Sequence, residues 1–344
     1  MTHQLLEWYE KNKRELPWRE TSDPYKIWVS EIILQQTQVK TGIKYYDKFI
    51  TTFPNVKALS IAKEIEVLKI WEGLGYYRRA LNMLHAAKTI VYDYNNIFPI
   101  KYNDLIKLKG IGAYTAAAIS SICYNEKRAV VDGNVYRVLS RLYNIKTPIN
   151  THIGKKKFQK IADELIPNKN PGTYNQAIMD FGSIHCKKNN PKCNICPLIK
   201  NCKGLIFNNI DNLPVKQLSK KLKIRHFNYL FITDDDYFII EQRGSSDIWS
   251  KLYQLPLIES GAPMNRKLLI QNNYFEPFNI LDIKHEYNTN HILSHQKLII
   301  SFWKINTDRI KSNTIAIRIK KTDIKKYPFP KPLQKYFNKA YLNY

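Results

Sequence analysis

Residues 1–202 carry apolar side chains at helical spacing, and glycines and prolines separate the apolar stretches. Asp23-Pro24 is typical of a helix start, because the acid caps free N–H groups and proline lacks the N–H that would be left over. Helices are predicted over 24–36, 38–52, 63–72, 77–94, 113–123, 134–143, 152–166 and 172–185. No strand-like alternation interrupts them, so an all-α domain is predicted.

The pattern changes in the second half of the chain. A polar, basic connector covers 203–225, and its last part, 216–225, is predicted to link domains 1–215 and 226–344. Apolar runs at 227–231 and 237–240 flank three aspartates, which predicts a β-hairpin. A further strand is predicted over 298–303 and a closing helix over 331–341. The second domain is therefore predicted to be α+β, in a multi-domain chain.

Length and charge narrow the class of protein. The 344 residues suffice for two domains of ordinary size. The 54 Lys and Arg outnumber the 29 Asp and Glu, which gives a net charge of +25 spread over both halves. This excess favours a polyanion as partner, with nucleic acid the first candidate. A soluble protein from a generally lysine-rich proteome and a ribosome-associated protein are the alternatives.

The sequence shows no apolar run long enough to span a membrane and no signal or transit segment at its N-terminus. We therefore expect no membrane partner and expect the protein to remain in the cytoplasm.

Two glycines, Gly110 and Gly112, separate two predicted helices. A helix start presents free backbone N–H groups, and glycines let a phosphate approach them closely. The pattern is that of a helix-hairpin-helix contact to the DNA backbone, and a plain helix connector is the alternative.

Two acids stand at positions suited to catalysis. Glu31 lies among apolar residues on a predicted helix, where desolvation would raise its pKa and keep it available as an acid. Asp132 directly precedes a predicted helix, and Asn134 is a second capping group there. A solvent-facing glutamate and a purely structural N-cap are the alternatives.

Two polar or aromatic segments could insert into nucleic acid. Gln36 and Thr37 end the helix that carries Glu31 and are unusual for a core element. In the segment 73–79, glycines present Tyr76 and Tyr77 ahead of two arginines, a combination suited to base extrusion. Core packing of one tyrosine is an equal alternative.

Four of the five cysteines cluster within 186–202, at Cys186, Cys193, Cys196 and Cys202. Clustered thiols favour a metal over disulfides. The uneven spacing suits a four-iron cluster somewhat better than zinc, and the residues alone leave both open. Cys123 lies in an apolar stretch and is expected to be a buried filler.

In this order, the elements resemble the helix-hairpin-helix DNA glycosylases related to endonuclease III. The Cys-x6-Cys-x2-Cys-x5-Cys spacing matches the iron–sulfur loop of that family, so the resemblance implies a [4Fe–4S] cluster. The branch that the chain most resembles is the A/G-mismatch-specific adenine DNA glycosylases. The segments that carry this resemblance are 16–19 (Leu-Pro-Trp-Arg), 30–39, 73–77 and 132–135.

Tyr114 distinguishes the branches of the family chemically. Bifunctional relatives carry a lysine there that attacks the sugar, whereas tyrosine cannot form an imine. The resemblance therefore implies a monofunctional glycosylase in base excision repair. A bifunctional glycosylase and a non-catalytic, redox-tuned DNA-binding module remain as alternatives.

The resemblance also implies roles for individual residues. Glu31 would protonate adenine, and Asp132 would stabilise the sugar cation that forms. Asn134 would position Asp132 and the water, and Tyr114 would pack against the sugar. The residues expected to contact base or DNA are Trp18, Arg19, Gln36, Thr37, Tyr76, Gly110 and Gly112, with a monovalent cation possible at the hairpin glycines.

Residues 226–344 resemble the Nudix-like domain of the same branch, which senses the oxidised base opposite adenine. Ser294 and His295 match two residues of its sensing loop, and Leu293 stands where the family has phenylalanine. No Arg-Glu-x2-Glu-Glu helix is present, so pyrophosphate hydrolysis is not expected. The implied partner is double-stranded DNA with adenine opposite 8-oxoguanine or guanine, bound by a monomer.

Overall fold

The structure is a computed structural model that describes residues 1–217, 222–234, 236–275, 278–308 and 316–340. It divides the chain into two compact units. The first contains residues 1–62 and 82–218, and the second contains residues 63–81 and 219–344. The second unit thus includes a segment that the sequence analysis placed in the first domain.

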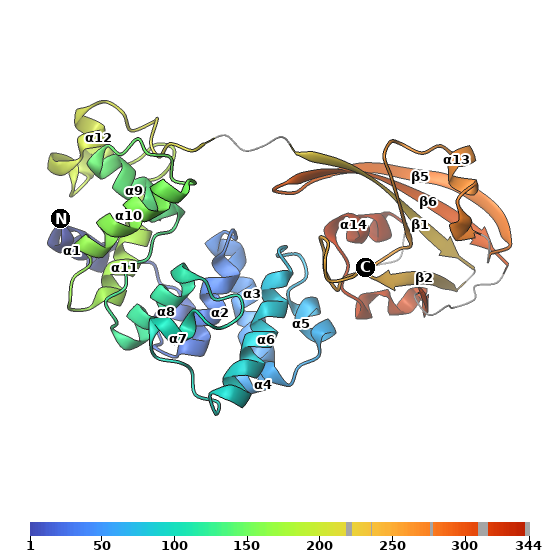
Figure 1. The fold of residues 1–344 in the computed structure, drawn as a ribbon, viewed down its shortest axis with the longest axis horizontal. Coiled ribbons are helices and arrows are strands. Elements are labelled where there is room, and N and C mark those ends of the chain that lie inside the picture. The colour runs from blue at the N-terminus through green and yellow to red at the C-terminus, as the bar shows by residue number, and fades with distance from the viewer. Residues whose placement is uncertain (218–221, 235, 276–277, 309–315, 341–344) are drawn as a thin grey trace. The chain divides into compact units, whose positions relative to one another are not determined.

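The first unit is helical, as predicted (Figure 1). Its α-helices are α1 (Thr2–Asn12), α2 (Pro24–Leu34), α3 (Val39–Thr52), α4 (Val56–Ser60), most of α6 (Arg78–Asp93), α7 (Tyr102–Leu105), α8 (Ala113–Tyr124), α9 (Gly133–Tyr143), α10 (His152–Leu165), α11 (Pro171–Asp180) and α12 (Lys203–Ile206). Short 3-10 turns lie at Pro17–Arg19, Cys193–Ile195 and Ile199–Asn201.

Two central helices, α2 and α8, pack against each other. The Asp23 carboxylate caps α2 by accepting from the Tyr25 amide at 2.9 Å, with Pro24 at the first helical position, as predicted. Every residue of α2 from Ile27 to Ile33 is buried. In α8 the run Ala116–Ala118 is buried, and its small side chains allow a close approach. These two helices fix the positions of Glu31 and Tyr114.

The turn between α7 and α8 is the predicted hairpin. Gly110 has φ +84°, and a Cβ there would stand 2.6 Å from the Asn82 Cβ, so glycine is required. Gly112 is the N-cap of α8 and has open space around its Cα. The backbone at the start of α8 is therefore exposed to an approaching group.

Helices α9 and α11 complete the core beside α1. The buried residues Val135, Val138 and Leu142 of α9 pack in one cluster with Tyr174, Ala177 and Ile178 of α11. The helix predicted over 172–185 ends as α-helix at Asp180 and continues as one π-helical turn, η2 (Phe181–His185). A Cβ on Gly182 would stand 2.6 Å from the Asn134 Cβ, so this turn approaches the start of α9 closely.

The second unit is built on a seven-stranded sheet, with α5 (Glu64–Ile70) from the earlier segment. The strands are β1 (Lys223–Thr233), β2 (Tyr237–Gln242), β3 (Tyr253–Gln254), β4 (Leu257–Ser260), β5 (Ile280–Ile292), β6 (Gln296–Thr307) and β7 (Ala316–Lys320). The order is β3-β2-β1-β6-β5, with β4 paired to β1 and β7 to β2. Only β1 and β6 pair in parallel among the described strands.

Side chains alternate along β1 between two cores. Tyr229 and Phe231 pack with α14 (Lys331–Lys339), whereas Leu230 and Ile232 pack with Leu269 of α13 (Arg266–Ile270). The sheet therefore carries a helix on each face, and the predicted α+β class is confirmed (Figure 1).

Several boundaries differ from those predicted. Strand β1 begins at Lys223, inside the predicted linker, because its pairing with β6 starts there, at Gln296. Arg225 also pairs with Asp247 and Glu259 of neighbouring segments. The sequence analysis did not predict α1 or the long strand β5. No helix in the described ranges is long and apolar enough to cross a membrane.

Candidate active site

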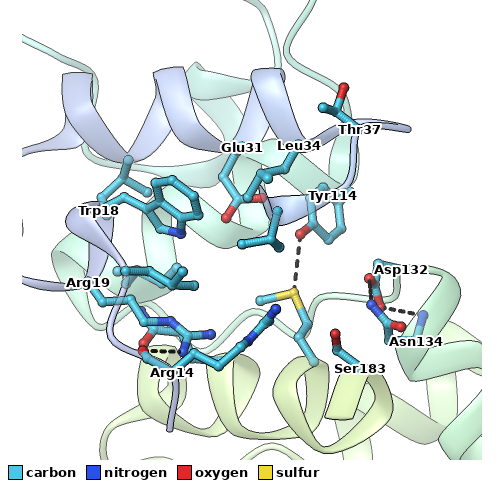
Figure 2. Close-up of a pocket in the computed structure, with 16 residues that line it drawn as sticks. Arg14, Trp18, Arg19, Glu31, Leu34, Thr37, Tyr114, Asp132, Asn134 and Ser183 are labelled. Atoms are coloured by element: carbon cyan, nitrogen blue, oxygen red, sulfur yellow. Dashed lines mark hydrogen bonds between the residues drawn. The ribbon is translucent and has the colours of Figure 1, made fainter. Parts of the chain in front are cut away.

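A pocket of about 160 Å³ opens in the first unit where α2, α8, α9, α11 and the loop before α2 meet (Figure 2). It brings together Glu31 from α2, Tyr114 from α8 and Asp132 and Asn134 from the start of α9. These segments are far apart in sequence, and all four predicted catalytic residues line this one pocket.

Glu31 is a buried acid, 7% exposed, and faces the pocket. Burial raises its pKa to about 7, chiefly because desolvation penalises the carboxylate. The nearby Tyr114 hydroxyl and Arg19 guanidinium lower the pKa, while the negative charge of Asp132 raises it. Glu31 is thus able to hold a proton near neutral pH.

Asp132 caps α9 with its carboxylate. It accepts from the amides of Asn134 at 2.9 Å and Val135 at 2.8 Å, and from the Asn134 side chain at 2.8 Å. Burial raises its pKa, and these three hydrogen bonds oppose the rise because they favour the ionised form. The N-cap role and a place in the pocket therefore coexist, so the structural alternative does not exclude the catalytic one.

Asn134 is held by Arg137, which the sequence analysis missed. The Arg137 guanidinium donates to Asn134 Oδ1 at 2.9 Å, to the Gly182 carbonyl at 2.5 Å and to the Cys186 carbonyl at 2.8 Å. This arginine joins the N-terminal end of α9 to the π-helical turn and to the first of the four clustered cysteines.

The loop before α2 supplies the other wall. Trp18 is 5% exposed and packs edge-on against Tyr46, with ring centroids 5.2 Å apart. Arg19 lines the pocket and pairs with the buried Asp180. Among the lining residues that were not predicted as site residues, four carry a polar or sulfur-containing side chain, namely Arg14, Gln176, Met179 and Ser183.

These missed residues differ in what they offer. Gln176 accepts a hydrogen bond from the Tyr9 hydroxyl at 2.9 Å, and the Tyr114 hydroxyl donates to Met179 Sδ at 3.2 Å. Ser183 lies on the π-helical turn, a deformation common at functional sites. This turn marks the site in the structure, but the sequence gives no sign of it because residue types do not predict a π-helical turn.

Of the remaining predicted contact residues, only Thr37 is among those that line the pocket. Gln36 is exposed with φ 60° just beyond α2. Tyr76 is 50% exposed with φ 49° and belongs to the second unit's segment 63–81. Ser294 and His295 form the exposed turn between β5 and β6. Gln36 is therefore next to a pocket-lining residue without lining the pocket itself, and Tyr76, Ser294 and His295 belong to the second unit.

The four clustered cysteines are free thiols of intermediate burial that act on one another electrostatically. The buried Arg141 donates toward Cys186 Sγ at 3.5 Å, so a positive group lies beside the sulfurs. Within the described part of the chain, no three Cys, His, Asp or Glu side chains gather closely enough to hold one metal ion. A four-iron cluster brings its own sulfides and spaces its ligands more widely, which is compatible with this arrangement.

Comparisons with known proteins agree with this architecture. Residues 29–167 match the family model of the HhH-GPD superfamily of base excision DNA repair proteins, and residues 228–339 match the NUDIX domain. A thermostable thymine-DNA glycosylase is 29% identical with a TM-score of 0.56, over 60% of this chain and 95% of that one. An endonuclease III–DNA complex shares the fold at 21% identity and a TM-score of 0.52, over 60% of this chain and 94% of that one. The molecule is therefore a base-excision DNA glycosylase with a C-terminal Nudix-like domain.

Relatives that match over most of their length identify the branch of the family. The adenine DNA glycosylase of Buchnera aphidicola subsp. Baizongia pistaciae is 39% identical, over 86% of this chain and 83% of that protein. Its counterpart in Buchnera aphidicola subsp. Acyrthosiphon pisum is 34% identical, over 96% of this chain and 95% of that protein. The chain belongs to the adenine DNA glycosylases.

The raised pKa of Glu31 predicts a cost to stability above neutral pH. Folding lifts this pKa from 4.5 to about 7, so ionising Glu31 opposes folding as the pH rises through that interval. Glu31→Gln should therefore raise the free energy of unfolding at pH 8 by about 2 to 3 kcal/mol and leave it nearly unchanged at pH 4.

Denaturant unfolding at both pH values measures the effect. Glu7→Gln, at an exposed glutamate of α1, is the matched control and should give no such difference. An equal effect of Glu31→Gln at pH 4 and pH 8 would show that the buried carboxyl does not titrate as described.

Proposed function

We propose that this glycosylase hydrolyses the N-glycosidic bond of adenine mispaired with 8-oxoguanine or guanine, without cutting the DNA strand. The observation that supports this most is one pocket lined by two carboxyls in different surroundings. Glu31 is desolvated with a pKa raised to about 7, and Asp132 receives three hydrogen bonds that favour its carboxylate. Different environments give two acids separate roles in one reaction.

Adenine is a poor leaving group as an anion. Glu31 donates its proton to N7 of the flipped base, so the base departs as a neutral molecule when the bond to C1′ breaks. The sugar is left with oxocarbenium character, and the Asp132 carboxylate stabilises that positive charge. Water then adds to C1′ and gives a proton to the Glu31 carboxylate, which the first step left ionised, so the acid is regenerated and the hydrolysis is complete.

The neighbours of the two acids support these roles. Asn134 is fixed by Arg137 and donates to Asp132, so it orients the carboxylate. Tyr114 stands where bifunctional relatives carry lysine, and a phenol forms no imine with the sugar. Trp18 and Arg19 line the same pocket and are proposed to contact the adenine.

We assign the surrounding DNA contacts by the same reasoning. The exposed backbone at Gly110 and Gly112 suits a DNA phosphate, with a monovalent cation at the hairpin carbonyls. Gln36 and Tyr76 are proposed to occupy the space that the extruded adenine vacates, and Thr37, which lines the pocket, is proposed to contact the substrate. The enzyme is proposed to act as a monomer in the cytoplasm, on the nucleoid.

The β5–β6 turn is proposed to recognise the oxidised base. Ser294 Oγ and His295 Nδ1 lie 3.2 Å apart on an exposed turn that is closed by the bond from the Leu293 amide to the Gln296 carbonyl at 2.8 Å. Both side chains can hydrogen-bond to a base. Leu293 packs against the core of the second unit, so its side chain is engaged in holding the turn.

Adenine release from duplexes with adenine opposite 8-oxoguanine, guanine or thymine tests the proposal. The wild type should act on the first two and not on the third, and borohydride should trap no covalent complex. Glu31→Gln and Asp132→Asn should each lower the single-turnover rate by at least about a hundredfold. Ser294→Ala with His295→Ala should reduce the preference for 8-oxoguanine over guanine.

The exposed Glu7→Gln serves as the control for the charge change and should leave all rates unchanged. Efficient borohydride trapping, or full adenine release by Glu31→Gln, would contradict the proposed chemistry. Equal release opposite all three bases would contradict the mismatch specificity.

Proteins of this fold family usually carry a [4Fe–4S] cluster, and we propose that Cys186, Cys193, Cys196 and Cys202 hold one here. The cluster would cross-link the loop 186–202, and the positive charge of Arg141 beside Cys186 would offset its negative thiolates. Arg137 joins this loop to Asn134, so the loop also supports the catalytic end of α9.

Iron and sulfide analysis of the purified protein tests the cluster. Four irons per chain and a broad absorption near about 400 nm are expected. Cys196→Ser should lose the iron, whereas Cys123→Ser, at the cysteine outside the loop, should keep it. A colourless protein with stoichiometric zinc would contradict this assignment.

A further inference from the structure

Asp180 is a fully buried carboxylate at the end of α11 that binds two arginines. Arg19 forms a bidentate pair with it, Nη1 to Oδ2 at 2.6 Å and Nη2 to Oδ1 at 2.7 Å. Arg14 donates from Nε to Oδ1 at 2.9 Å and from its backbone amide to Oδ2 at 3.3 Å. One buried negative charge is therefore shared between two guanidinium groups.

Arg19 stands between two carboxyl groups. Its side chain is 12% exposed and lines the pocket, where Glu31 acts on it electrostatically, while Asp180 holds both of its terminal nitrogens. The guanidinium also lies over the Tyr9 ring, 5.6 Å from the centroid, and donates to the Arg14 carbonyl at 3.1 Å. These contacts fix its plane at the pocket wall.

Without Asp180, this arrangement would change in a predictable way. Two guanidinium groups would be left without a negative partner beside a low-dielectric pocket, where an unpaired buried charge is costly. Glu31 is the carboxyl that Arg19 already faces across the pocket. An arginine released toward it would form an ion pair and stabilise the ionised form of that acid.

We propose that Asp180 is a positioning residue that keeps Arg19 paired away from Glu31 and so leaves Glu31 able to carry the proton that it donates to adenine. This inference rests on the proposed role of Glu31 as the acid. Asp180 itself does not line the pocket, so it acts through Arg19.

Other charged and titratable groups face Glu31 and must be considered with it. They are Arg14 and Arg19 from the loop before α2, Tyr114 and Cys123 from α8, and Asp132 at the start of α9. Tyr9 of α1 and Asp180 of α11 act on Arg19 instead. Desolvation and Asp132 raise the pKa of Glu31, while Tyr114 and Arg19 lower it. Without Asp180, Arg19 would interact more strongly with Glu31 and lower its pKa further, so Glu31 should lose its proton at a lower pH.

The pH dependence of single-turnover adenine release by the full-length protein tests this inference. Asp180→Asn keeps the shape of the side chain and removes its charge. The alkaline limb of the profile is the pH range in which Glu31 loses its proton and the rate falls. This limb should shift to lower pH by about one unit or more. The rate at pH 8 should therefore fall about tenfold, while the rate at pH 5.5 changes little.

A purely structural role predicts another outcome. Partial unfolding would lower the rate by the same factor at every pH and would leave the limb where it is. Asp180→Glu should restore the wild-type limb, and Asp163→Asn, the same change at an exposed acid of α10, should not move it.

Substituting Arg19 tests whether Asp180 acts on Glu31 through this arginine. Arg19→Gln alone should move the limb to higher pH, a readout that remains if Asp180→Asn fails to fold. The double variant Asp180→Asn/Arg19→Gln should return the limb to the wild-type position or above it. If the alkaline limb does not move in Asp180→Asn, the inference is overturned. If only Arg19→Gln can be measured, an unmoved limb in that variant overturns it. A limb that stays at lower pH in the double variant also overturns it. Full activity of Glu31→Gln in the same assay would instead overturn the proposed function.

Discussion

Burial of the Glu31 carboxyl where α2 meets α8 is the interaction on which the rest of the site depends. Helix α2 is buried around Glu31, and the alanines of α8 let the two helices approach closely. Desolvation raises the pKa of the acid to about 7, which costs stability but keeps a proton available at neutral pH. The neighbouring groups Tyr114, Asp132 and Arg19 then adjust the pKa that burial has raised.

At Asp132, in contrast, hydrogen bonds favour the ionised form of the carboxyl. Asp132 is also desolvated, yet two backbone amides and the Asn134 side chain donate to its carboxylate. A helix N-terminus supplies these donors at no further cost, so the fold itself favours a negative charge at this point. Two carboxyls in one pocket thereby receive different electrostatic surroundings from helix packing alone.

Local patterns predicted part of this arrangement. Glu31 among apolar neighbours indicated burial, Asp132 before a helix indicated an N-cap, and Gly110 and Gly112 indicated the hairpin turn. Asp180 could not be found this way, because its partners Arg14 and Arg19 lie more than 160 residues away and helix periodicity says nothing about such pairs. The same limit applies to the parallel pairing of β1 with β6, which joins Phe227 to Ile300. Segment 63–81 was assigned to the first domain for the same reason.

The central claim is that folding places the titration of Glu31 near neutrality. The most direct measurement is the carboxyl ¹³C chemical shift of Glu31 in the folded, DNA-free protein as a function of pH, assigned by its loss in Glu31→Gln. We expect a midpoint near pH 7, well above the 4.5 of an ordinary glutamate. A midpoint between pH 4 and 5 would contradict this prediction, because the acid would then hold almost no proton at neutral pH.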